Sequence, residues 1–186
     1  TVICTDKTGT ITENAMHLHT LYNYYSDTAF EATHFDTPEL AELIQFAMWS
    51  SEPVPFDPME KTIHQVYGTT QINDLRQAYH MVHEYPLGGK PPMMTHIFED
   101  AIGHRITAAK GAPEAILDVS NLSESEKNKL RKSIQDYGNQ GFRVLGVAKG
   151  GFEGTDFPEY QQDMSFEFLG FTVFYDPPKQ GIQEVF

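Results

Sequence analysis

The chain has 186 residues, of which 40% are hydrophobic and 12% aromatic, so it can bury at least one sizeable core. Its 26 acidic and 13 basic side chains give a formal charge of −13, which argues against nucleic acid and anionic membrane surfaces as partners. The single cysteine excludes an intrachain disulfide and a thiolate metal site.

The longest nearly uncharged apolar stretch, FLGFTVFY at 168–175, is typical of a buried strand. It is far shorter than the roughly 20 residues that span a bilayer. No signal peptide is expected, because the first motif begins almost at the first residue. We therefore expect this chain to be soluble.

The first elements are expected to be strands. Residues 1–5 (TVICT) predict a short buried strand that presents Asp6 to a loop at its carboxyl end, where open α/β sheets bind ligands. The mixed aromatic and polar residues of 18–35 predict one or two more strands.

Three helices are predicted next. The first, in the segment 36–52, begins with Thr37 as its cap. The second begins with Asp57 as its cap and is expected to end at Gly68. The third is expected over 73–81.

The remaining pattern is rich in hairpins. Residues 81–114 predict strands joined by a turn and a Gly-containing hairpin, and Ser123 and Glu126 form the capping box of a long helix. Two strands, FRVLGVAK at 142–149 and FEFLGFTVFY at 166–175, follow. Because no regular βαβ repeat is present, we predict an α+β fold with a mainly antiparallel, twisted sheet flanked by helices.

The stretch DKTGT at 6–10 has the chemistry of a phosphate-handling loop. Asp6 can attack a phosphoryl group and form an aspartyl phosphate. Gly9 lets the backbone approach phosphate oxygens, beside Lys7 and the donors of Thr8 and Thr10. Asp6 and a neighbouring carbonyl, that of Thr8, are candidate Mg²⁺ ligands. The same residue types also occur in ordinary surface turns, so that alternative stays open here.

The residue two positions after Asp6 distinguishes a loop that rapidly hydrolyses its phosphoenzyme from one whose phosphoenzyme persists. Hydrolases with this type of loop carry a second aspartate there, which protonates the leaving group and then activates water. This chain has Thr8 instead. Loss of an acid/base group removes a factor of roughly 10²–10⁴ in rate, which predicts a phosphoenzyme that persists.

The segment ICTDKTGTIT at 3–12 closely resembles the phosphorylation signature of P-type ATPases, which belong to the haloacid dehalogenase (HAD) superfamily. Three more segments match in the family's order. KGAPE at 110–114 resembles the lysine motif of the nucleotide domain, and FRVLGVA at 142–148 resembles its arginine strand. DPPK resembles the hinge that returns to the phosphorylation domain, which assigns that role to Asp176, Pro177 and Pro178.

The resemblance implies a domain layout. Residues 1–20 would begin the phosphorylation domain, 21–174 would form an inserted nucleotide-binding domain, and 175–186 would re-enter a truncated, HAD-like α/β phosphorylation domain. The rest of that domain, the actuator domain and the membrane domain would lie elsewhere in a longer chain. The isolated piece would then bind ATP without turnover, because its Mg²⁺ site is incomplete. We expect its two terminal segments to pair with each other or to be mobile.

The resemblance also implies a stacking aromatic for the adenine of ATP. Tyr85, in EYPLGGK at 84–90, stands where the family usually has phenylalanine, and Lys90 would lie near the phosphates. Leu87 occupies a place where the family often has an arginine, which removes one phosphate contact. Alternatively, Tyr85 is a strand aromatic of the core.

Five further residues complete the implied pocket. Glu60 matches the acidic residue that accepts from the adenine amino group, although a glutamate here also suits helix capping. Lys110 would line the adenine pocket and reach toward phosphate, and Gly111 would leave room for the base. Arg143 offers a planar fork for phosphate or ribose oxygens, and Leu145, on the same strand face, would pack on the base.

The eight histidines show no metal-ligand pattern and are interpreted as surface residues; His17, His19, His80 and His83 are the closest pairs in sequence.

Three functions are compatible with these features. The favoured one is an ATP-driven cation pump at the cytoplasmic face of a membrane, with ATP as substrate, Mg²⁺ as cofactor and the transported cation bound elsewhere. Motif spacing resembles calcium, sodium or magnesium pumps more than heavy-metal pumps, and calcium is preferred. A HAD-type phosphatase or phosphotransferase that uses Asp6, and a nucleotide-binding module without chemistry, are the alternatives.

Overall fold

The computed structural model describes residues 4–31, 34–70 and 73–182, with only the backbone of Lys7 and Thr8. Their centre is one seven-stranded sheet in the order β2-β1-β7-β6-β5-β4-β3, in which every neighbouring pair is antiparallel. The strands are β1 (His17–Asn23), β2 (Thr28–Glu31), β3 (Tyr79–Tyr85), β4 (Met93–Asp100), β5 (Arg105–Gly111), β6 (Arg143–Gly151) and β7 (Ser165–Tyr175).

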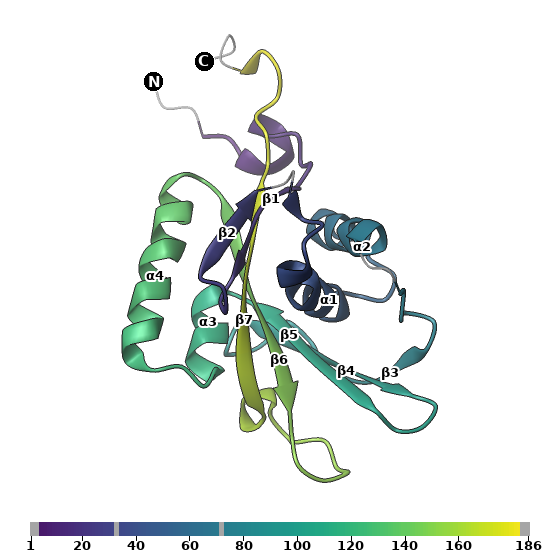
Figure 1. Cartoon of the computed structure of the whole chain (residues 1–186). Helices are drawn as coiled ribbons and strands as arrows, with labels where there is room; N and C mark the ends of the chain where they lie inside the picture. The colour runs from purple at the N-terminus through teal and green to yellow at the C-terminus, as the bar shows by residue number, and fades with distance from the viewer. Residues whose placement is uncertain (1–3, 32–33, 71–72, 183–186) are drawn as a thin grey trace.

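Helices cover both faces of the sheet (Figure 1). Helices α1 (Ala41–Trp49) and α2 (Pro58–Thr70) lie on one face, and α3 (Pro113–Val119) and α4 (Glu124–Asn139) lie on the other. Short helical turns are η1 (Lys7–Ile11), η3 (Pro38–Leu40) and η4 (Gln161–Asp163). The predicted α+β fold with a helix-flanked antiparallel sheet is therefore confirmed.

Each face of the sheet has its own hydrophobic core. Alternate residues of one strand enter different cores: Ala108 packs with α1 and α2, whereas its neighbour Ala109 packs with α3 and α4. Strand β7 alone contributes Phe174 to the first core and Phe171 to the second. This two-sided burial follows from the alternation of side chains along a strand.

The capping predictions for α2 and α4 are confirmed. The Asp57 carboxylate accepts hydrogen bonds from the Met59 and Glu60 amides, at 2.8 and 3.4 Å. Ser123 and Glu126 form the reciprocal capping box of α4. Caps depend on neighbours in sequence, which explains why sequence patterns located them.

Several element predictions are wrong. Residues 79–81 belong to strand β3, because pairing with β4 overrides the local helical pattern of 73–81. Helix α2 continues past Gly68, and α3, which begins at Pro113, was not predicted. Of the predicted strand 1–5, residues 1–3 lie outside the described residues, and the two that follow are exposed and not in a strand.

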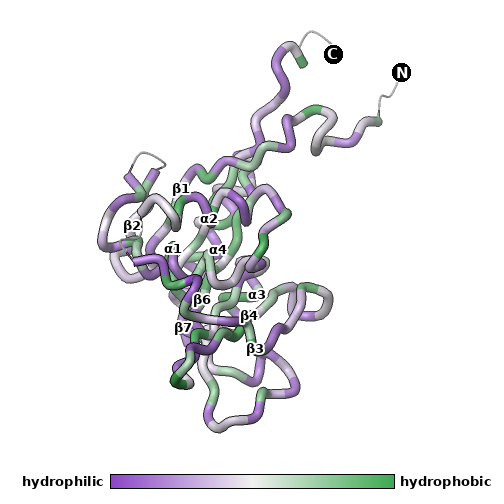
Figure 2. Tube along the Cα trace, turned by 90° about the vertical axis from the view of Figure 1, so that its right-hand side faces the viewer, coloured by the Kyte–Doolittle hydropathy of each residue, from purple (hydrophilic) through white to green (hydrophobic). Residues whose placement is uncertain are grey.

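The two terminal segments pair with each other, as predicted. They extend together beyond one end of the sheet in both views (Figures 1 and 2). The Asp176 carboxylate accepts from the Thr12 hydroxyl at 2.6 Å and from the Ala15 amide at 3.1 Å. A β-bridge joins Thr12 to Pro178, and the Lys179 ammonium donates to the Gly9 carbonyl. Asp176 thus holds the entering and leaving chains side by side.

Within the described part of the chain, no helix combines the length and apolar character needed to cross a bilayer.

Gly170 is required where β7 bulges between β1 and β6. Its φ is +156°, and a Cβ atom there would lie 1.9 Å from the Tyr22 carbonyl oxygen. We expect Gly170→Ala to lower the free energy of unfolding by about 3 kcal/mol or more, the upper range for overpacking. Urea denaturation followed by circular dichroism measures this.

The matched control is Gly138→Ala in helix α4, where a Cβ meets no atom within 4 Å. It should stabilise the chain by about 0.5–1 kcal/mol. Equal effects of the two substitutions would contradict the close approach at Gly170.

Candidate functional site

A cleft of about 380 Å³ opens on the sheet face that carries α1 and α2. This volume is in the range of small-molecule sites, about 300–1,000 Å³. The loop between α1 and α2, the first turn of α2, the β3–β4 connection and strands β4 to β6 contribute its walls. Its lining residues are Glu52, Phe56, Asp57, Met59, Glu60, Glu84, Pro86, Leu87, Met94, Lys110, Gly111, Arg143 and Leu145.

A buried ion pair forms one wall of the cleft. The Lys110 ammonium donates to Glu60 Oε1 at 2.5 Å and to the Ser51 hydroxyl at 3.1 Å. The two charged side chains are only 12% and 9% exposed. Desolvation lowers the pKa of Lys110, and the Glu60 carboxylate opposes that shift. The pair places Glu60 and Lys110 together, as the sequence reasoning expected.

The second carboxylate oxygen of Glu60 is an acceptor without a partner. Oε2 is buried, and no described donor lies within hydrogen-bond distance. Such a group carries a desolvation cost of about 1–3 kcal/mol, more when charged. A ligand donor that enters the cleft would remove this cost.

Apolar side chains form the rest of the inner surface. Phe56 and Leu87 line the cleft yet are 78% and 62% exposed. Met59, Met94 and Leu145 add more buried apolar surface. Large apolar groups so exposed at the mouth of a cleft suit a planar, partly apolar ligand.

Arg143 is the cation at the edge of the cleft. It begins strand β6 and is exposed, and Leu145 lies two residues further along the same strand. Both line the cleft, as strand alternation predicts. The Arg143 guanidinium is therefore available for an anionic part of a ligand.

Gly111 lines the cleft for a reason that differs from the expected one. A Cβ atom at this position would lie 2.5 Å from the Pro92 carbonyl oxygen and 2.6 Å from Met93 Cα. The absence of a side chain is therefore required by the close approach of the neighbouring strand, whether or not a ligand is present.

Tyr85 does not lie in the cleft, which corrects the predicted stacking role. Its hydroxyl donates to the Pro158 carbonyl on the opposite face of the sheet, and its ring lies beside His83. Its neighbour Glu84 faces the cleft instead. The two residues are consecutive in β3, so alternation places them on opposite faces. Phe56 and Glu52 line the cleft although the sequence assigned them no role. Leu87 also lines it, although the sequence indicated only a lost phosphate contact there.

Lys90 is exposed in the β3–β4 connection, outside the lining of the cleft. Asp6 is also exposed and does not line it. The backbone of Lys7 to Ile11 forms a single helical turn, with Gly9 at φ +76°, while the side chains of Lys7 and Thr8 lie outside the described residues. Thr10 in this turn is exposed. The structure therefore does not bring the phosphate-handling loop and the cleft together.

Asp6 does not sit in a set of metal ligands. Among the described residues, the group of His, Cys, Asp and Glu side chains placed to hold an ion consists of Glu52, Glu84 and His96. Asp6 is not one of these three residues.

The interpretation of the histidines as surface residues is wrong for His96, which is fully buried on β4. His17, His19 and His80 are exposed, whereas His83 is half-buried and stacks on Phe157. Burial of His96 follows from its place on a central strand, not from any local pattern.

A second hollow, of about 420 Å³, lies between η3, α1 and the end of α2. Among the described residues of its lining, Asp36 is the one that is charged, and it is exposed, while Phe35, Ile44, Tyr67 and Leu75 supply apolar surface. The first cleft, which contains the buried Glu60 carboxylate, is therefore the better functional candidate.

The chain resembles one family and several curated proteins. Residues 39–181 match the model of the family described as "P-type ATPase, cytoplasmic domain N". A probable cation-transporting P-type ATPase of Mycoplasma genitalium is 28% identical over 98% of this chain and 21% of its own length. Calcium-transporting ATPase 1 of Bacillus cereus is 24% identical over 99% of the chain and 23% of its own length. A plasma membrane ATPase of Neurospora crassa is 25% identical over 96% and 18%. The chain thus spans about a fifth of the length of these relatives.

The buried ion pair gives a stability prediction. Lys110→Met leaves the Glu60 carboxylate buried and unpaired, so we expect a loss of about 3–5 kcal/mol in the free energy of unfolding. The double variant Glu60→Met/Lys110→Met should recover most of this loss, because no charge then stays buried. Chemical denaturation of the single and double variants measures the coupling.

Lys149→Met is the control. Lys149 makes ion pairs with Glu42 and Glu167 at 2.9 and 3.0 Å, but all three side chains are at least 32% exposed. Its loss should cost less than about 1 kcal/mol. Additive effects at Glu60 and Lys110 would show that the pair is not coupled.

Proposed function

Since the chain belongs to the family of P-type ATPase cytoplasmic N domains, we propose that its cleft binds ATP for a longer cation-transporting ATPase. The proposed layout is the one that the motifs imply, with 21–174 as the nucleotide-binding domain between two pieces of the phosphorylation domain. The family match over 39–181 supports the position of the central domain.

One observation carries the assignment of adenine. Glu60 Oε2 is a buried, charged acceptor without a partner, and Lys110 already occupies Oε1. The exocyclic amino group of adenine is a donor that fits this oxygen. Guanine presents a carbonyl oxygen at the same ring position, which would face the carboxylate without a hydrogen. The site should therefore prefer ATP to GTP.

The remaining lining supports a nucleotide pose. Phe56 and Leu87 provide apolar surface for the faces of the base, and Leu145 lies deeper in the cleft. In this pose Phe56, not Tyr85, is the stacking aromatic. Arg143 at the edge of the cleft is placed to meet ribose or phosphate oxygens. In the proposed pose Lys110, paired with Glu60, lines the adenine end of the cleft and reaches from there toward phosphate. Lys90 lies outside the lining and would approach the phosphates from the β3–β4 connection.

We assign the phosphoryl acceptor role to Asp6. Its carboxylate would form the aspartyl phosphate, and Thr8 in place of an acid would let this intermediate persist. Mg²⁺, when bound, neutralises charge on the transferred phosphoryl group. In this proposal, its other ligands come from the parts of the parent protein outside this chain. The pairing of Asp176 with Thr12 keeps Asp6 on a defined hinge, from which domain closure can bring it to the nucleotide.

The parent protein is proposed to be a membrane pump with this domain on the cytoplasmic side. The missing phosphorylation, actuator and membrane domains would be its intramolecular partners, and the cation would bind in the membrane domain. Calcium is the proposed cation, supported by motif spacing and by the printed name of the B. cereus relative.

The first test is binding. Amide-shift titration of this chain should give an ATP affinity in the micromolar to millimolar range, about −8 to −4 kcal/mol. GTP should bind about 10-fold more weakly, since it loses one charge-assisted hydrogen bond. Phe56→Ala and Glu60→Gln should each weaken ATP binding by a similar factor.

Tyr85→Phe is the control, because its hydroxyl and ring lie on the opposite face. It should leave the affinity for ATP unchanged. If Tyr85→Ala abolished the shifts while Phe56→Ala did not, the assignment of the cleft would be wrong.

The second test uses the full-length parent protein. Asp6→Asn should abolish the acid-stable phosphoenzyme formed from γ-labelled ATP, because an amide cannot form the acyl phosphate. Glu60→Gln should still be phosphorylated, at about 10-fold higher ATP concentration. A labelled Asp6→Asn protein would overturn the role of Asp6 and leave the ATP site unaffected.

A further inference from the structure

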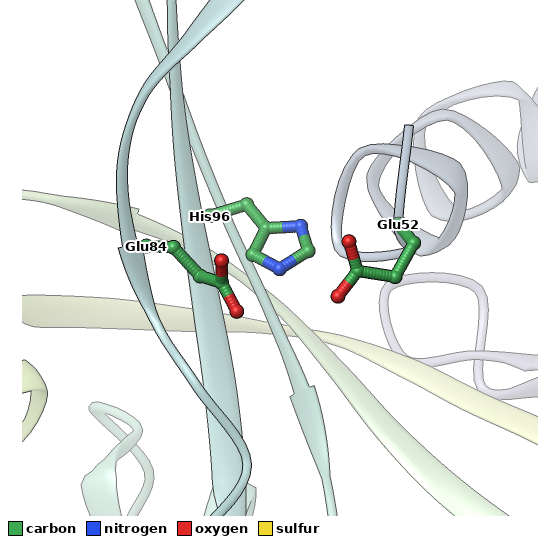
Figure 3. A group of neighbouring side chains, drawn as sticks. All are labelled: Glu52, Glu84 and His96. Carbon is green, nitrogen blue, oxygen red and sulfur yellow. The ribbon is translucent and has the colours of Figure 1, made fainter. Parts of the chain in front are cut away.

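We propose that Glu52, Glu84 and His96 form a binding site for a divalent transition-metal cation of the Zn²⁺ type, beside the nucleotide cleft. Figure 3 shows the imidazole of His96 between the two carboxylates. One ligand atom from each side chain lies within 4.8 Å of the other two. This site does not include Asp6, Glu60 or Lys110.

Three different elements bring the ligands together. Glu84 on β3 and His96 on β4 are direct cross-strand partners, so their side chains project from the same face of the sheet. Glu52 comes from the loop that follows α1. In a tetrahedral site with metal–ligand distances of about 2.1 Å, two ligand atoms lie about 3.4 Å apart. The ligand atoms must therefore move closer together around an ion, and the exposed Glu84 side chain is the freest to move.

The burial of His96 is a second observation, besides the grouping of the three side chains, that points to a ligand. The residue is fully buried, and among the described residues the Ser51 backbone is the hydrogen-bonding neighbour that acts on its ring. Because buried polar groups are nearly always paired, the other ring nitrogen needs an explanation. A metal bound to one nitrogen supplies the missing partner.

The charges around the ring favour a cation. The nearby Lys110 ammonium is already paired with Glu60. Three carboxylates and one ammonium leave a net negative charge here, which favours a cation.

The set of donors indicates the class of metal. One imidazole nitrogen and two carboxylate oxygens suit Zn²⁺ and similar borderline ions, whereas Mg²⁺ and Ca²⁺ prefer oxygen ligands alone. Glu52 and Glu84 also line the cleft. Further coordination positions would thus face solvent or a cleft ligand.

The test uses this chain without nucleotide, so failure here leaves the proposed ATP site untouched. Isothermal titration with Zn²⁺ measures affinity, and the ring ¹⁵N shifts of His96 report coordination. We expect one site whose Zn²⁺ a large excess of Mg²⁺ does not displace. Glu84→Gln and His96→Gln should each weaken Zn²⁺ binding at least about 10-fold.

Two matched variants remove the same residue types elsewhere. His80 is exposed on β3, and Glu153 is exposed in the loop after β6. His80→Ala and Glu153→Gln should leave Zn²⁺ affinity unchanged. Glu84→Gln is the decisive variant, because an exposed side chain can change without loss of the fold, which the amide spectrum verifies.

The proposal is overturned if Zn²⁺ does not bind, or if it binds without a shift of the His96 ring nitrogens. Equal affinity of the wild-type chain and Glu84→Gln would also overturn it. Loss of binding in His80→Ala would place the metal on surface histidines instead.

Discussion

Burial of the sheet on both faces is the constraint on which the rest of this structure depends. Successive residues of a strand alternate between the two cores except at bulges, as in β7, where Phe168 and Phe171 enter the same core. A shift of one position therefore changes the environment of a side chain completely. Ala109 is buried against α3 and α4, while Lys110, the next residue, reaches the cleft that is the proposed nucleotide site. The same alternation puts Tyr85 in one core and Glu84 in the cleft.

The cleft combines groups that a fold without a ligand would avoid. In its wall, Glu60 is buried and keeps an unpaired carboxylate oxygen, and Phe56 is left largely exposed. His96 is buried beside the lining residues Glu52 and Glu84. A buried ion pair is weak evidence for stability, because desolvation offsets the attraction between the charges. Both proposed ligands would satisfy these groups: the amino group of adenine at Glu60, and a metal cation at His96.

The hinge links this site to the proposed chemistry. Contacts from Asp176 to Thr12 and Ala15 hold the two terminal segments together, although most of the proposed phosphorylation domain lies outside the chain. The cleft and Asp6 belong to different parts of the structure. The proposed phosphoryl transfer would therefore require closure of one part on the other, as positioning dominates this chemistry.

The sequence by itself determined the features that depend on near neighbours: the caps at Asp57 and Ser123, the strongly apolar strand β7, and the ordered motifs around Asp6, Lys110, Arg143 and Asp176. These features and the expected antiparallel sheet predicted the fold class. The motifs also located part of the cleft lining, namely Glu60, Lys110, Gly111, Arg143 and Leu145. Only the tertiary structure decided that 79–81 is a strand, that Phe56 and Leu87 line the cleft, and that Glu52, Glu84 and His96 meet. These outcomes depend on pairing and packing between residues far apart in the chain, which carry no local signal.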